Sequence, residues 1–140
     1  MSIAFADAHY GIAMLNPRDP WRPAIEMFEA RVDHPELVTT EEVLLEVLAF
    51  YSGRGAHFRT VAAELVRELL ADSSVDVIHQ SHESFLRGLD LYERRGDKGY
   101  SLVDCVSMAV MRERGITDVL SGDQHFRQEG FVPLIDPDAP

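Results

Sequence analysis

Two hydrophobic patterns meet within residues 37–51, LVTTEEVLLEVLAFY. The apolar pair Leu37-Val38 predicts a short strand, and the spacing of Thr39 and Glu42 is that of a helix capping box. The apolar residues that follow predict a helix over 41–51, which ends at the turn residues 52–55. A strand that passes directly into a helix is the repeating unit of an α/β fold with a parallel sheet.

The same alternation continues along the chain on both sides of this segment. Short apolar runs predict strands over 3–6, 75–78, 119–121 and 131–134, and helical patterns cover 10–15, 24–30, 57–70, 81–94 and 101–114. This order predicts a mostly parallel sheet with helices on both faces. In such a sheet the functional crevice lies beyond the carboxyl ends of the strands. Those positions follow Ala6 and Ser121, and an aspartate lies close after each.

Length and composition limit the class of protein. The 140 residues, 46% hydrophobic and 26% charged, predict a single globular domain over 1–140. The apolar runs are far shorter than the ~18 residues of a membrane-spanning helix. The first residues lack the basic region of a signal peptide, and Cys105 has no second cysteine for a disulfide. We therefore expect a cytoplasmic protein without a membrane partner.

The net charge of −11 argues against broad electrostatic attraction to nucleic acid or anionic lipid. Most of the 24 acidic residues carry no information, because surface helices need charge. Three acids are different. Asp7 is the first charged residue of the chain, Glu46 is the one charge within 43–51, and Asp104 is the one charge within 102–111.

These three acids have no Lys or Arg within four residues in the sequence. A carboxylate in apolar surroundings is costly unless it is paired or bound to a metal. Carboxylate oxygens favour Mg²⁺ or Mn²⁺, whereas zinc prefers His or Cys. If Asp7, Glu46 and Asp104 converge at one end of the sheet, they predict a magnesium-type site.

Asp123 is the fourth candidate, with the Ser121 hydroxyl two residues before it. It could equally be a turn aspartate beside a glycine. Asp104 could serve as the third residue of a capping box that begins at Ser101, which does not exclude metal binding. His9 and His125 follow two of the acids and could contact a phosphate, although most such histidines are structural.

Four segments together resemble the PIN-domain ribonucleases, and among them the VapC-type toxins of bacterial toxin–antitoxin pairs. Phe5-Ala6-Asp7 and Val43–Leu48 are similar to the segments that carry the first two acids of this family. Tyr100–Cys105, Ser121–Phe126 and Gly130-Phe131 are similar to its C-terminal half. The resemblance spans essentially the whole chain. It implies a three-layer fold with a short parallel sheet between two layers of helices.

The resemblance also implies a Mg²⁺- or Mn²⁺-dependent endoribonuclease that acts on RNA phosphodiester bonds. Asp7, Glu46, Asp104 and Asp123 would be its catalytic metal ligands, and Ser121 the supporting hydroxyl near the last acid. Many relatives carry Thr or Ser after the first acid, where this chain has Ala8-His9. The family habit adds a homodimer and a cognate antitoxin, whose basic part would suit an acidic toxin.

Binding of RNA by so acidic a protein needs local cations. The candidates are Arg54, Arg59, Arg94, Arg95 and Lys98. Two other functions remain open. The first is a catalytically inactive PIN-like binding module that keeps its acids for folding. The second is a receiver domain, which is disfavoured because Asp7 stands alone and no lysine follows Lys98.

Overall fold

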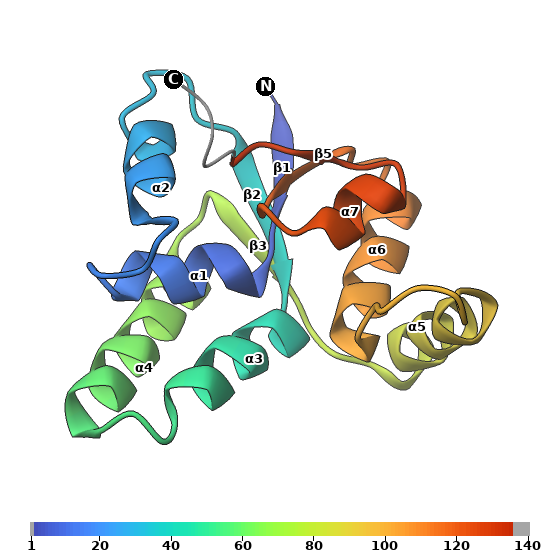
Figure 1. Cartoon of the computed structure of the whole chain (residues 1–140), viewed down its shortest axis with the longest axis horizontal. Coiled ribbons are helices and arrows are strands. Elements are labelled where there is room, and N and C mark those ends of the chain that lie inside the picture. Colours follow the sequence, from blue (N-terminus) through green and yellow to red (C-terminus); the bar gives the residue numbers. More distant parts are fainter. Residues whose placement is uncertain (1, 136–140) are drawn as a thin grey trace.

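The computed structural model describes residues 2–135 and contains a five-stranded sheet in the order β3-β2-β1-β4-β5 (Figure 1). Every neighbouring pair of strands is parallel, which confirms the predicted α/β class. The strands are β1 (Ile3–Ala6), β2 (Glu36–Thr40), β3 (Val75–Ile78), β4 (Asp118–Leu120) and β5 (Val132–Pro133).

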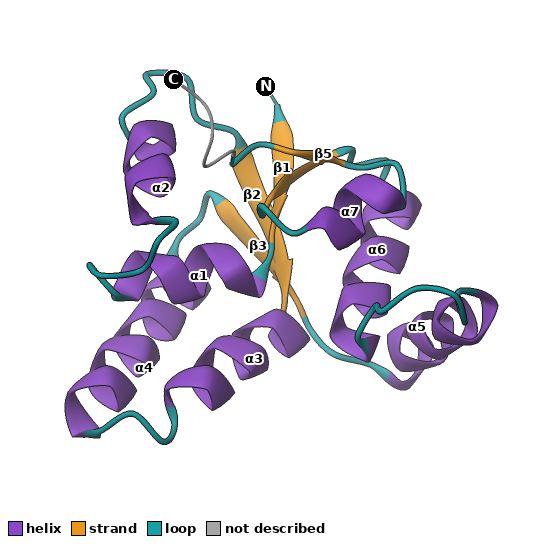
Figure 2. Ribbon diagram, in the orientation of Figure 1, coloured by secondary structure: helices purple, strands orange, loops and turns teal. Residues whose placement is uncertain are grey.

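Helices cover both sides of this sheet and make the predicted three layers (Figure 2). One side carries α1 (Ala8–Leu15), α2 (Arg22–Glu29), α3 (Glu41–Tyr51) and α4 (Ala56–Ala71); the other carries α5 (His82–Arg94), α6 (Leu102–Arg114) and α7 (Gln124–Gln128). Helix α7 was not predicted, because five residues are too few to show a helical period. Within residues 2–135, no helix has the length and apolar character needed to cross a membrane.

Alternate residues of the central strands enter two hydrophobic clusters, as the period of a strand requires. Phe5 and Val119 belong to the larger cluster, which also takes up residues of α3 and α6. Ala4 and Leu120 belong to the smaller cluster against α1 and α2. Both faces of β1 and β4 are therefore buried, which explains why their sequences are continuous apolar runs.

The cap of α3 lies one residue later than the sequence predicted. Thr40 is the N-cap, and its hydroxyl accepts a hydrogen bond from the Val43 N–H over 3.1 Å. Thr39 still belongs to β2, where its hydroxyl donates to the carbonyl oxygen of Ala6 over 2.8 Å. The predicted Thr39–Glu42 capping box was wrong, because the strand continues through both threonines. The glycine stop of α6 is confirmed by Gly115, which has φ 66°.

The direction of the chain changes at β1. From β1 it passes through β2 to β3, and then returns to place β4 and β5 on the opposite side of β1. Such a switch point separates the loops that follow β1 and β4 and leaves a crevice at their carboxyl ends. The topology thus places Asp7 and residues 121–123 at the same edge of the sheet.

Candidate active site

Four acidic side chains from four different segments surround the switch point. Asp7 follows β1 and is the N-cap of α1, whereas Asp123 follows β4 and is the N-cap of α7. Asp104 is the third residue of α6, and Glu46 lies in the middle of α3. Asp7 and Asp104 are buried, with 6% and 8% of their surface exposed. The structure therefore brings the four predicted acids to the same end of the sheet.

Ser121 joins the two loops of the switch point. Its side chain is fully buried, and its hydroxyl donates a hydrogen bond to Oδ2 of Asp7 over 2.9 Å. The Ser121 hydroxyl oxygen also accepts a hydrogen bond from the backbone N–H of Asp123 over 3.0 Å. One hydroxyl thus fixes the Asp7 carboxylate and the backbone that carries Asp123.

Asp104 is held by the first turn of its own helix. Its Oδ2 accepts the Ser101 N–H, and its own N–H donates to the Ser101 hydroxyl, each over 3.0 Å. This is the capping box that the sequence left open as an alternative. Capping and a place in the acidic cluster prove compatible, because Asp104 lies beside the other acids while it caps α6.

The electrostatics show how closely the four carboxyl groups interact. Burial, followed by the negative charge of Asp104, raises the pKa of Asp7 to about 7, and the Ser121 hydrogen bond partly opposes this. Burial raises the pKa of Glu46 as well, and the charges of Asp104 and Asp123 add to the effect. Asp7 and Glu46 are therefore harder to ionise, first because they are buried and second because neighbouring acids carry the same charge.

The chemistry of these donors fits a hard divalent cation. All four side chains offer carboxylate oxygens, and these are the ligands that Mg²⁺ and Mn²⁺ favour. A cation among them would also offset the repulsion from Asp104, which adds to burial in raising the pKa of Asp7. Asp104 and Asp123 have ligand atoms close enough to share one ion.

A second wall of the site is formed by His9 and Trp21. The Gly122 N–H donates to Nδ1 of His9 over 3.3 Å, and the rings of His9 and Trp21 meet edge to face at 4.5 Å. A Cβ on Gly122 would lie 1.9 Å from the Trp21 ring, so a side chain at position 122 would displace the indole. Burial lowers the pKa of His9, which keeps its imidazole neutral as an acceptor.

Comparison with known proteins assigns the family. A family model described as "PIN domain" matches residues 4–131. The chain belongs to the PIN-domain family. Its curated relatives include "23S rRNA-specific endonuclease VapC20" of two Mycobacterium tuberculosis strains, CDC 1551 / Oshkosh and ATCC 25618 / H37Rv. Each is 32% identical over 100 residues, which cover 71% of this chain and 74% of the relative.

A solved structure supports the same conclusion for this PIN domain. The crystal structure of M. tuberculosis VapC20, described as a "Sarcin-Ricin loop cleaving toxin", superposes with a TM-score of 0.84 at 27% identity. The match covers 96% of this chain and 100% of that one. These findings confirm the predicted resemblance to VapC-type toxin endonucleases.

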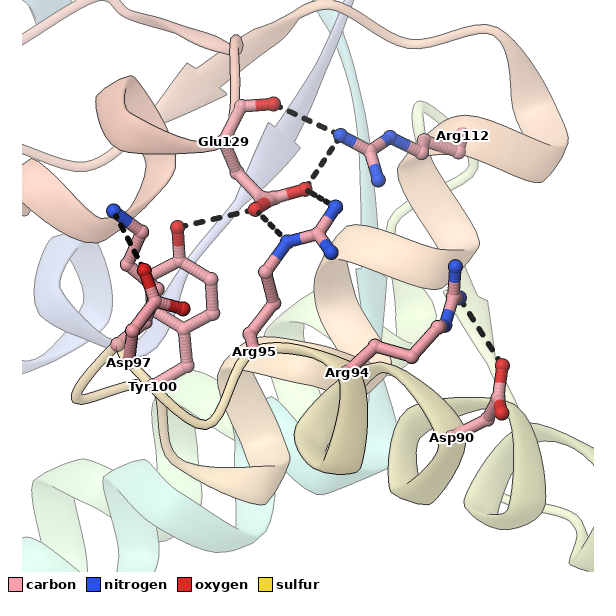
Figure 3. Close-up of polar contacts among 8 residues, drawn as sticks. Asp90, Arg94, Arg95, Asp97, Tyr100, Arg112 and Glu129 are labelled. Atoms are coloured by element: carbon pink, nitrogen blue, oxygen red, sulfur yellow. Dashed lines mark hydrogen bonds and ion pairs between the residues drawn. The ribbon is translucent and has the colours of Figure 1, made fainter.

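An ionic network centred on Glu129, shown in Figure 3, lies next to the site of this PIN domain. The side chain of Glu129 is 5% exposed; its carboxylate accepts from Arg95 Nε and Arg112 Nη2, each over 2.7 Å, and from the Tyr100 hydroxyl over 3.2 Å. The hydrogen bond from Arg95 is the main reason why the pKa of Glu129 falls to about 2. The Tyr100 ring in turn meets the His125 ring at 5.3 Å.

Sequence reasoning missed Trp21 and Glu129 as neighbours of the site. The partners of Glu129 lie 17 to 34 residues away along the chain, so no local pattern marks it. Trp21 resembles any partly buried aromatic residue at a core edge. The signal that could have found it is Gly122, a glycine beside a candidate ligand, since such a position often marks a close approach by another group.

The predicted RNA-binding cations of the PIN domain are scattered. Arg95 belongs to the Glu129 network, Arg94 pairs with Asp90 over 3.1 Å, and Lys98 lies 3.7 Å from Asp97. The remaining two, Arg54 and Arg59, lie beyond the C-terminal end of α3 and donate to the carbonyl oxygens of Phe50 and Ser52. Their contact with RNA stays a prediction.

Proposed function

We propose that this PIN domain is a metal-dependent endoribonuclease and the toxin of a toxin–antitoxin pair. The observation that carries the proposal is the cluster of four carboxyl groups at the switch point, where burial and then the charge of Asp104 raise the pKa of Asp7. A cation bound among these groups would offset the cost of holding several carboxyl groups together in a partly buried site. The family membership gives that cation a use in phosphodiester hydrolysis.

Asp7, Glu46, Asp104 and Asp123 would hold one or two Mg²⁺ or Mn²⁺ ions. A bound ion of this kind supplies an ionised water as nucleophile and neutralises the charge that develops on the phosphate. Ser121 keeps the Asp7 carboxylate in one orientation through its hydrogen bond to Oδ2. Because the pKa of Asp7 is about 7, a cation that binds near neutral pH would displace the proton from the protonated fraction of this carboxyl group.

The substrate that we propose is structured ribosomal RNA. The relatives are named for action on 23S rRNA and on the sarcin–ricin loop. We infer that the sarcin–ricin loop is also the substrate of this chain. We further infer that the protein acts in the cytoplasm. The net charge of −11 disfavours unspecific RNA binding, which suits an enzyme that cleaves at one structured site.

The same charge supports a basic partner. A cognate antitoxin with a basic segment would be attracted to this acidic protein. It would keep the nuclease inactive until the antitoxin is removed. A homodimer is the expected state of the free toxin, and its molecular mass in solution tests that expectation directly.

The test is cleavage of purified ribosomes and of a sarcin–ricin loop oligonucleotide with Mg²⁺ or Mn²⁺. We expect discrete fragments that disappear with EDTA. The Asp104→Asn variant should lose at least about a hundredfold in rate, because it removes one anionic ligand while the amide oxygen can still cap α6.

The matched control is Asp33→Asn, at an exposed position between α2 and β2. It should cleave at the wild-type rate. Equal activity of wild type and Asp104→Asn would contradict the proposal and would leave the acids with a structural role, as in a binding module.

A further inference from the structure

One nitrogen atom lies among the oxygen ligands of the proposed cation site. The Nδ1 atom of His125 forms a hydrogen bond with Oδ2 of Asp104 over 3.1 Å and lies 3.6 Å from Oδ1 of Asp123. The ligand atoms of these three residues all lie within 4.8 Å of one another. His125 comes from the first turn of α7, the helix that Asp123 caps.

These distances have the spacing of ligands that share one metal ion. Two adjacent ligands of an octahedral ion, with bonds of about 2.1 Å, are separated by about 3 Å. The distance from His125 Nδ1 to Asp104 is close to this value, and that to Asp123 is slightly longer. The two carboxylates and the imidazole can therefore reach the same ion with small side-chain adjustments.

The charge of the cluster favours a neutral ligand at this position. Burial raises the pKa values of Asp7 and Glu46, and the negative charges of neighbouring acids raise them further. A further carboxylate would add to that repulsion, whereas a neutral imidazole supplies a lone pair without charge. Imidazole also suits transition metals better than it suits Mg²⁺, which binds oxygen almost exclusively in proteins.

We propose that Nδ1 of His125 is a direct ligand of the active-site cation and makes the site prefer Mn²⁺ to Mg²⁺. The inference deepens the proposed function, because it concerns the same cation site. It adds a nitrogen ligand to a site that the sequence describes with oxygen ligands alone.

The surroundings of His125 hold its ring in place for this role. The Tyr100 ring contacts it at an angle of 60°, and the Tyr100 hydroxyl donates to the buried carboxylate of Glu129. Glu129 is itself fixed by Arg95 and Arg112, as Figure 3 shows. Tyr100 is thus a positioning residue: it limits the motion of the imidazole and does not reach the ion itself.

The experiment is pulsed electron paramagnetic resonance of the full chain loaded with Mn²⁺, which detects coupling to a ligated ¹⁴N nucleus. We expect nitrogen coupling in the wild type and its loss in His125→Ala. The loss of a ligand should weaken Mn²⁺ binding by about tenfold or more, a size typical of a disrupted metal site. Mg²⁺ affinity, measured by competition with Mn²⁺, should change much less.

His57→Ala, on the exposed surface of α4, is the matched control and should keep both the coupling and the affinity. Wild-type protein that binds Mn²⁺ without nitrogen coupling would overturn the inference, whether or not the variant folds. Coupling that persists in His125→Ala would overturn it too. RNA cleavage is scored separately, so nitrogen ligation without nuclease activity would refute the proposed function and leave this inference standing.

Discussion

At the scale of single residues, Asp7 is the site residue whose ionisation costs the folded state the most free energy. It is buried, it faces other acids, and it has one hydroxyl as a side-chain donor. Its folded pKa of about 7 lies above the ordinary value of 3.8. The folded chain therefore holds this proton more tightly than the unfolded chain does, so the associated stability is complete below pH 4 and is lost as the pH rises through 7.

Asp7→Asn tests this sign in metal-free protein. The amide is neutral at every pH, whereas wild type loses about 1.4 kcal/mol for each pH unit between pH 5 and the Asp7 pKa of about 7. The variant should therefore gain about 3 kcal/mol of stability over wild type as the pH rises from 5 to 8. Urea unfolding in EDTA at both pH values measures the difference. Asp33→Asn should follow the wild-type curve; a variant advantage that is equal at the two pH values would show that Asp7 is ionised throughout.

At the scale of elements, the close packing of α5 on α6 depends on Gly88. A Cβ at this position would lie 2.5 Å from Cγ2 of Val106 and 3.2 Å from its backbone nitrogen. Gly88→Ala should therefore destabilise the fold by about 1–3 kcal/mol, although alanine favours an exposed helix by up to about 1 kcal/mol.

A double-mutant cycle with Val106→Ala, measured by denaturant unfolding, tests whether the clash with Val106 causes the destabilisation. Because alanine at position 106 leaves room for the new Cβ, the double variant should recover part of the lost free energy of unfolding. Gly53→Ala, where a Cβ meets open space, should stay within about 0.5 kcal/mol of wild type. A neutral Gly88→Ala would mean that the two helices can move apart at no cost.

The sequence predicted the regular elements well because their signals are local. The range of α3 and the capping box of α6 both follow from residues a few positions apart. What it could not predict depends on contacts between distant segments. The N-cap shifted to Thr40 because the end of β2, including Thr39, pairs with β3. Glu129 gained its role from Arg95, just after α5, and Arg112, on α6.

The candidate site was predictable to the same extent. Isolated acids in apolar runs identified Asp7, Glu46 and Asp104 as unusual, and the rule on strand ends placed Asp7 and Asp123 together. The position of His125 Nδ1 between two of these acids depends on how α7 turns after β4, and no sequence period encodes that turn.

At the scale of the whole molecule, a bound cation would tie together segments from both helical layers. Asp7 and Glu46 belong to the side of α1 and α3, whereas Asp104 and Asp123 belong to the side of α6 and α7. An ion that binds the folded state alone stabilises it by about 2.7 kcal/mol at a hundred times its Kd.

Mn²⁺ at that concentration should raise the midpoint of thermal unfolding by several degrees at pH 8. Differential scanning calorimetry measures the shift, and Asp104→Asn should lose most of it. An equal shift in the variant would place the ion at another surface of the protein.

The order of the strands has a consequence for how such an enzyme is made. β1 lies at the N-terminus, but its partner β4 begins at Asp118, and Phe5 pairs with Val119. Until β4 has been translated, β1 has no partner on that side, and Asp7 lacks both its hydrogen bond from Ser121 and its neighbour Asp123. If ribosomal RNA is the substrate, as we propose, the nascent chain gains an assembled active site, and with it the ability to cleave the ribosome that synthesises it, after residues 118–123 have emerged and folded.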